Sequence, residues 1–81
     1  MKITLRLFAT FRQIFNSGEI VYELPEGATV QDLLDGLFLK RPELQRFKDH
    51  VVVTINRQAS PSTAVIREGD EVAILPPVSG G

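Results

Sequence analysis

Cysteine is absent from this 81-residue sequence, and histidine occurs only once. Without a thiol, the chain cannot form a disulfide, bind a metal through thiolates or use a cysteine nucleophile. A single histidine likewise excludes a histidine-rich metal site, so we expect no metal-binding residues. We interpret His50 as an ordinary surface residue.

A charge excess of one sign and a long hydrophobic run are also missing. Nine basic side chains nearly balance ten acidic ones, and among the basic residues only Lys40 and Arg41 are adjacent. Nucleic-acid binding depends on clustered basic residues, so we expect no such partner. No segment approaches the roughly 20 apolar residues of a membrane span, and residues 1–6 alternate instead of forming the apolar stretch of a signal peptide. We expect a soluble, cytoplasmic protein without a membrane partner.

The length of the chain predicts one domain with a thin core. A chain of 81 residues is too short for two ordinary domains, and a domain this small buries only about 60–65% of its unfolded surface. Little room is left for a deep active site of its own. We expect residues 1–75 to form an α+β domain and residues 76–81 to form a flexible, extended tail.

Alternation of apolar and polar residues predicts two strands near the N-terminus. In residues 2–8 and 19–24, every second side chain falls on an apolar inner face. These inner residues are Ile3, Leu5, Leu7, Ile20, Tyr22 and Leu24. Phe8 falls on the outer face, where the pattern calls for a polar residue. Residues 9–15, between the strands, favour a short helical turn.

The middle of the chain predicts one long amphipathic helix. Thr29 can cap its N-terminus, and Asp32 near the third helical position interacts favourably with the helix dipole. Five apolar residues follow the i, i+3, i+4, i+7, i+8 rule of one buried face: Val30, Leu33, Leu34, Leu37 and Phe38. Pro42 is expected to end the helix or to force a break in it. Leu44 and Phe47 are expected to attach the next segment to the core.

The second half predicts short elements separated by turns. Val51–Ile55 and Glu71–Leu75 favour strands, and Val72 and Ile74 share one face of the last strand. Residues 64–66 are a candidate short strand. Turns or loops are expected at Asn56–Gln58, Ser60–Ser62 and Glu68–Asp70.

This order of elements indicates one helix packed on one face of a mixed sheet. The arrangement resembles the β-grasp of ubiquitin-like domains. The resemblance implies a sheet of four or five strands, in which the first and last strands lie side by side at the centre.

The most informative segment is the tail, Pro76-Pro77-Val78-Ser79-Gly80-Gly81. The two prolines stop strand pairing directly after Leu75 and favour a stiff, extended segment. Six extended residues at about 3.3 Å each reach roughly 20 Å. Gly80 and Gly81 lack side chains, so they can thread a channel too narrow for a Cβ atom. We expect this tail to be mobile in the free chain and ordered in a complex; the alternative for the glycine pair alone is a frayed terminus.

The α-carboxylate of Gly81 is the functional group expected at the tip of the tail. A carboxylate is anionic at neutral pH and lacks a good leaving group, so it must be activated before a nucleophile can attack it. Formation of an acyl-adenylate with ATP is the usual route. A sulfur nucleophile can then convert the adenylate into a thiocarboxylate. The chain needs no cysteine for this chemistry, which agrees with the absence of cysteine.

Three further residues are candidate partner contacts. Phe8 and Leu75 are apolar on faces that the alternation marks as outward. If the first and last strands are neighbours, these two side chains form one exposed patch, which either a partner or a covering loop would explain. Arg12 is a candidate contact on the short helix, with a solvated helix charge as the alternative.

The C-terminal run resembles the ending of molybdopterin synthase small subunits, ubiquitin-like sulfur carriers of the MoaD and ThiS type. That family typically shows Gly-Asp-Glu-Val, two apolar residues and then Pro-Pro-Val-Ser/Thr-Gly-Gly. Residues 69–81 match this pattern, except that three apolar residues instead of two stand between Val72 and Pro76. Weaker resemblances occur at Leu7-Phe8-Ala9, at residues 26–30 and 33–34, and at Asn56.

The resemblance implies a sulfur carrier, not an enzyme that acts alone. A ubiquitin-activating-like adenylyltransferase would adenylate Gly81 with ATP, and a desulfurase or rhodanese-type donor would supply the sulfur. The tail would then insert into a large synthase subunit and transfer sulfur to cyclic pyranopterin monophosphate. The interface would include Phe8, Leu75 and residues 76–79, with Ala59 at its border. No cofactor would be bound permanently.

Other functions remain compatible with the sequence. One is a sulfur carrier for another pathway, such as thiamine synthesis or tRNA thiolation, although thiamine carriers are usually shorter and lack the Pro-Pro-Val tail. A second is a ubiquitin-like modifier that joins Gly81 to substrate lysines. A third is a plain interaction domain whose tail takes part in no chemistry.

Overall fold

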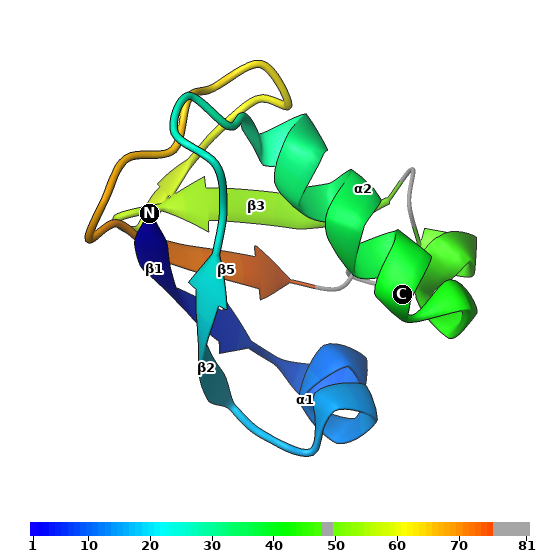
Figure 1. Cartoon of the computed structure of the whole chain (residues 1–81). Helices are drawn as coiled ribbons and strands as arrows, with labels where there is room; N and C mark the ends of the chain where they lie inside the picture. Colours follow the sequence, from blue (N-terminus) through cyan, green and yellow to red (C-terminus); the bar gives the residue numbers. More distant parts are fainter. Residues whose placement is uncertain (48–49, 76–81) are drawn as a thin grey trace.

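The computed structural model describes residues 1–47 and 50–75 and consists of a five-stranded sheet with one long helix across it (Figure 1). The strands are β1 (Lys2–Leu7), β2 (Glu19–Glu23), β3 (Val52–Ile55), β4 (Gln58–Ala59) and β5 (Glu71–Leu75). The helices are α1 (Ala9–Phe15), α2 (Val30–Lys40) and the 3-10 helix η1 (Pro42–Phe47).

Strands β1 and β5 form the centre of the sheet, whose order is β2-β1-β5-β3-β4. They pair in parallel, with Leu5 opposite Val72, whereas the other neighbours pair antiparallel. This mixed sheet with its single long helix is the expected β-grasp arrangement. The prediction that the first and last strands are adjacent is therefore confirmed.

The core lies between helix α2 and one face of the sheet. Ile3, Leu5 and Leu7 of β1 and Val72 and Ile74 of β5 are all buried on this inner face. The five apolar residues predicted for the buried face of the helix are buried as well, and they complete the cluster from the other side. Burial of apolar surface from both elements stabilises the fold at roughly 25 cal/mol per Å². The inner and outer faces of the sheet are thereby fixed.

The N-terminus of α2 is closed by a reciprocal pair of hydrogen bonds. The amide N of Asp32 donates to Thr29 Oγ1 at 3.2 Å, and the amide N of Thr29 donates to Asp32 Oδ2 at 2.9 Å. This capping box satisfies two N–H groups that have no partner within the helix. The predicted cap is confirmed.

Replacing Thr29 by alanine is expected to lower the free energy of unfolding by about 1 kcal/mol, because the amide of Asp32 loses its acceptor. Thr63→Ala is the matched control, since Thr63 is an exposed threonine that lies outside the helices and strands. Urea unfolding of both variants measures the difference. Equal stability of the two variants would show that the cap contributes nothing.

The segment after α2 is attached to the core by Leu44 and Phe47, as predicted. Leu44 is fully buried, and the ring of Phe47 meets that of Phe11 edge to face, with the centroids 5.5 Å apart. Such edge-to-face pairs are favourable beyond their buried area. Helix α1 is thereby held beside η1 at one end of the sheet.

The hairpin between β3 and β4 differs from the sequence prediction. Gln58 belongs to strand β4 and pairs with Ile55, so the turn contains only Asn56 and Arg57. Both have positive φ, 50° and 72°, as the tight two-residue hairpin turn requires. The Asn56 side chain also accepts a hydrogen bond from the amide N of Glu71 at 3.0 Å. Asn56 therefore joins this hairpin to the start of β5.

Other predicted strands also differ from the structure. Strand β2 ends at Glu23 instead of residue 24, and β3 begins at Val52 instead of residue 51. The expected strand at residues 64–66 is only an isolated bridge between Val65 and Thr29. Strand β1 ends at Leu7, so Phe8 lies just beyond the strand instead of within it. The tight turn before β5 is confirmed, with Gly69 at a φ of 83° and Asp70 Oδ2 accepting from the amide of Arg67.

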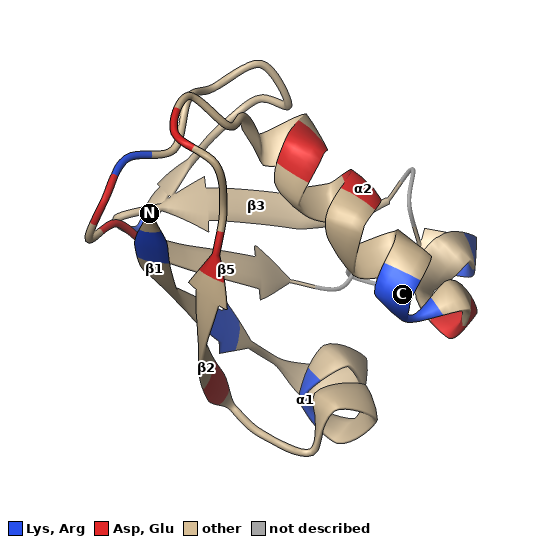
Figure 2. Ribbon diagram, in the orientation of Figure 1, with Lys and Arg blue, Asp and Glu red and all other residues tan. Residues whose placement is uncertain are grey.

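The charged residues are interspersed over strands, helices and loops, with both signs mixed (Figure 2). No helix in the described parts of the chain is long and apolar enough to cross a membrane.

Candidate partner interface at the end of the central strands

Three apolar side chains meet on the outer face of the sheet, where β1 and β5 end. Leu7 pairs with Ile74, so the next residues in these parallel strands, Phe8 and Leu75, are neighbours. Leu75 in turn pairs with Val52 of β3. We call Phe8, Leu75 and Val52 the Phe8 patch. It lies on the face opposite helix α2.

The Phe8 patch is accessible. Phe8 is 38% exposed and Val52 44% exposed, and Leu75 between them is half-buried. Contiguous exposed apolar side chains are unfavourable in a free domain and mark interaction sites. The predicted pair Phe8 and Leu75 is therefore brought together, and Val52 is added to it.

The backbone around Phe8 directs this side chain outward. Phe8 is extended, with φ −126° and ψ 154°, and Ala9 has a φ of 50°, so the chain turns directly after Phe8. The carbonyl O of Phe8 accepts hydrogen bonds from the amides of Phe11 and Arg12 at 3.1 and 3.4 Å. Phe11 is buried, whereas Phe8 remains on the outer face.

Ala59 lies on the same face as the Phe8 patch, one row further along the sheet. Ala59 pairs with Thr54, and Thr54 pairs with Ala73. Ala73 is also opposite Arg6 in β1. Small side chains therefore occupy the surface beside the patch towards β4, with Ala59 at its outer edge. That Ala59 borders a partner interface stays a prediction.

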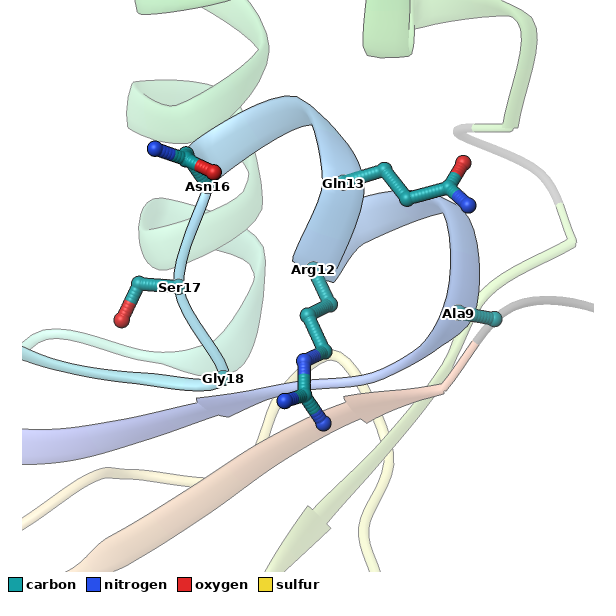
Figure 3. Close-up of a pocket in the computed structure, with 6 residues that line it drawn as sticks. All are labelled: Ala9, Arg12, Gln13, Asn16, Ser17 and Gly18. Atoms are coloured by element: carbon teal, nitrogen blue, oxygen red, sulfur yellow. The ribbon is translucent and has the colours of Figure 1, made fainter.

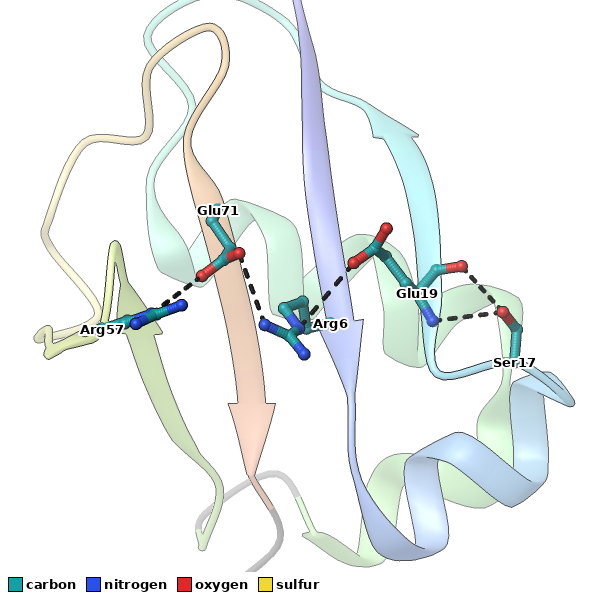
Figure 4. A network of polar contacts seen from close by, with 5 residues as sticks. All are labelled: Arg6, Ser17, Glu19, Arg57 and Glu71. Atoms are coloured by element: carbon teal, nitrogen blue, oxygen red, sulfur yellow. Dashed lines mark hydrogen bonds and ion pairs between the residues drawn. The ribbon is translucent and has the colours of Figure 1, made fainter.

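A row of charges crosses the outer face next to the patch (Figure 4). Arg6 Nη1 is 3.6 Å from Glu71 Oε2, and Arg6 Nε is 4.0 Å from Glu19 Oε2. Arg57 Nε is 3.7 Å from Glu71 Oε1. Ser17 exchanges two hydrogen bonds with the backbone of Glu19 at the β2 end of the row. The charges thus alternate in sign from β2 across to the β3–β4 turn.

Arg12 does not belong to the Phe8 patch. It is exposed and lines an open concavity of about 460 Å³ on helix α1 and the turn that follows it (Figure 3). The other lining residues are Ala9, Gln13, Asn16, Ser17 and Gly18. The lining is small and polar, and Arg12 provides its charged group. Arg12 thus remains a candidate contact separate from the patch.

The predicted tail residues lie outside the described residues: Pro76, Pro77, Val78, Ser79, Gly80 and Gly81. The expectation that this tail is mobile when free concerns the same residues and stays a prediction. Leu75 is the last residue of β5 and directly precedes Pro76. The Phe8 patch is therefore located where the chain leaves the sheet towards the predicted tail.

The sequence prediction did not identify Val52 or Arg6. Val52 is in the middle of the run Val51–Val53, where no alternation shows which side chain points outward. Arg6 is an expected outward charge of β1, but its neighbours depend on the pairing of three strands. The one available signal was the position of Arg6 two residues before Phe8 on the same face.

Comparison with known proteins gives matches over the whole chain. The sequence model of the ThiS family matches residues 5–81. A molybdopterin synthase sulfur carrier subunit of Arabidopsis thaliana is 36% identical over 81 residues, which cover all of this chain and 84% of that protein. Small archaeal modifier protein 3 of Haloferax volcanii is 34% identical over 92 residues, covering all of both proteins. The crystal structure of SAMP1 from Haloferax volcanii has a TM-score of 0.82 and 32% identity, with full coverage of both chains.

Proposed function

Because this chain belongs to the ThiS family, we propose that it is a sulfur carrier and acts as the small subunit of a molybdopterin synthase. The observation that supports this most is the location of the Phe8 patch beside Leu75, directly before Pro76. A partner bound to the patch would hold the domain while the residues after Leu75 extend into the partner's pocket. The name of the Arabidopsis relative, a sulfur carrier subunit, supports the same assignment.

The reactive group in this proposal is the carboxyl of Gly81. A carboxylate oxygen attacks the α-phosphate of ATP, pyrophosphate leaves, and Gly81 becomes an acyl-adenylate. The terminal sulfur of a cysteine persulfide on the donor then attacks the acyl carbon and displaces AMP, which gives an acyl disulfide. A thiol reduces the S–S bond of this intermediate, forms a disulfide with the donor cysteine and releases the thiocarboxylate of Gly81. A ubiquitin-activating-like adenylyltransferase catalyses the first step, and a desulfurase or rhodanese-type protein supplies the sulfur.

The acceptor in this proposal is cyclic pyranopterin monophosphate, bound by the large synthase subunit. The chain contributes the carried sulfur and the docking surface, and the large subunit contributes the catalytic pocket. Gly80 lets the tail enter a channel too narrow for side chains. The core of the chain is small, and side chains of helix α2 and the sheet fill it from both sides. This agrees with a catalytic pocket that belongs to the large subunit.

Intact mass spectrometry after co-expression with an activating enzyme and a sulfur donor tests the proposal. We expect the mass of the chain to change by the exchange of one oxygen for sulfur, and fragmentation to place the change at Gly81. Omission of the sulfur donor is the control and should leave the mass unchanged. An unmodified chain in the complete mixture would contradict sulfur carriage.

A second candidate is a ubiquitin-like modifier, which the likeness to small archaeal modifier protein 3 supports. In that case, the activated carboxyl of Gly81 is attacked by the amine of a substrate lysine and forms an isopeptide bond. Stable lysine conjugates in the same co-expression would favour this function. A sulfur carrier for thiamine synthesis or tRNA thiolation would give the same mass change but a different acceptor, which a sulfur-transfer assay with the purified large subunit distinguishes.

A further inference from the structure

The ring of Phe8 is in contact with a charged side chain of the strand that precedes it, β1. Arg6 and Phe8 are two residues apart and both face outward, and the guanidinium carbon of Arg6 is 5.8 Å from the centroid of the Phe8 ring. This separation is within the range of a cation–π contact. The exposed anchor of the patch is therefore in contact with a cation.

The guanidinium of Arg6 is restrained from both sides. Glu19 of β2 and Glu71 of β5 flank it at 4.0 and 3.6 Å, and their side chains approach Arg6 from opposite neighbouring strands (Figure 4). Glu71 is restrained in turn, because Arg57 contacts its other oxygen at 3.7 Å. One exposed ion pair restricts a side chain weakly, but a connected network of several charges is more effective.

We propose that Arg6 is a positioning residue that holds the Phe8 ring in the orientation in which the partner binds it. The proposal depends on the proposed function only for the identity of that partner, the large synthase subunit. A side chain that is ordered before binding loses less conformational entropy on association than a free one. The row of charges on the outer face thus increases the affinity of the partner for the Phe8 patch. The charged side chains do this without contacting the partner themselves.

The first test uses the free protein. Arg6→Met retains the aliphatic stem and removes the cation, so the Phe8 ring should lose order in NMR relaxation measurements of its ring carbons. Arg57→Met is the matched control: it also removes a cation that pairs with Glu71, but the cation–π contact of Phe8 is with Arg6. Arg6→Lys, which restores a cation, should recover part of the order. Thermal unfolding of each variant verifies that the domain remains folded.

The second test measures affinity for the large subunit. Arg6→Met should weaken binding about two- to fivefold, the size expected for an exposed cation–π contact. Arg57→Met should weaken it much less, because it removes only one support of Glu71 and leaves Arg6 on the Phe8 ring. In a Phe8→Ala background, Arg6→Met should have no further effect, because there is no ring left to position. Glu71→Gln should cause a smaller loss than Arg6→Met, since Glu19 still contacts the guanidinium.

The outcomes separate this inference from the proposed function. An unchanged order of the Phe8 ring in Arg6→Met would overturn the inference. So would an equal loss of affinity with and without Phe8, because Arg6 would then contact the partner directly. If the unsubstituted chain does not bind the large subunit, the proposed function fails, and ring order in the free protein still decides whether Arg6 positions Phe8.

Discussion

Deletion of Gly81 is expected to abolish adenylation of the chain while its fold remains intact. The deletion shortens the tail by about 3.3 Å, so the new terminal carboxylate no longer reaches the α-phosphate of ATP in the activating enzyme. Attack geometry is strict, and displacement by about 1 Å already costs on the order of 100-fold in rate. A shift three times larger should reduce the reaction below detection. ATP–pyrophosphate exchange with the activating enzyme measures it.

The matched control for this deletion is Ser79→Ala, which keeps the length of the chain and both glycines. It should be adenylated at nearly the normal rate. A chain extended by one residue past Gly81 should be as inactive as the deletion, because its reactive carboxyl is displaced in the other direction. Normal adenylate formation by the deletion variant would contradict the assignment of Gly81.

Replacing Phe8 by alanine is expected to weaken binding to the large subunit by about 2 kcal/mol or more, as loss of a buried anchor does. This corresponds to roughly a 30-fold increase in Kd. Stability should change much less, because Phe8 is 38% exposed in the free domain. Leu5→Ala should have the opposite profile and lower the free energy of unfolding by about 2–5 kcal/mol, since Leu5 is fully buried. Titration calorimetry and urea unfolding measure the two quantities.

Val21→Ala provides the surface control for Phe8→Ala. Val21 is also an apolar residue of the outer face, and it is 70% exposed, but it is opposite Thr4 on the edge strand β2, away from the Phe8 patch. Binding of this variant should be close to normal. If Phe8→Ala instead unfolded the domain and spared binding, Phe8 would belong to the core and the patch would not be the docking surface.

The sequence predicted those parts of the fold that depend on local pattern. The five buried residues of α2 and the cap at Thr29 follow from helical spacing and capping chemistry, and both occur in the structure. The turn at Gly69 follows from the conformational freedom of glycine. Strand β4 was missed because two residues are too few to show an alternation.

The candidate site was only partly predictable, because it is created by pairing between distant strands. Alternation marked Phe8 and Leu75 as outward, but the parallel register of β1 and β5 places them side by side. Val52 joins the patch through a second register, between β3 and β5. The contacts of Arg6 with Glu19 and Glu71 require both neighbours of β1 at once. Register is set by the whole fold, so a single-sequence pattern does not contain it.

The position of β5 in the sheet has a consequence for the order of folding events. Strands β2 and β1 form one antiparallel pair and β3 and β4 another, and β5 is the strand that joins them. Both local pairs can form early, but the sheet is completed only when residues 71–75 insert between them. Contacts between residues that are far apart in the sequence are slow to form, because closing the long loop between them costs conformational entropy. During synthesis, the proposed docking surface therefore assembles last, at the moment when residues 71–75 enter the sheet. A nascent chain without β5 lacks Leu75, so we expect it to bind the proposed partner more weakly than the complete chain does.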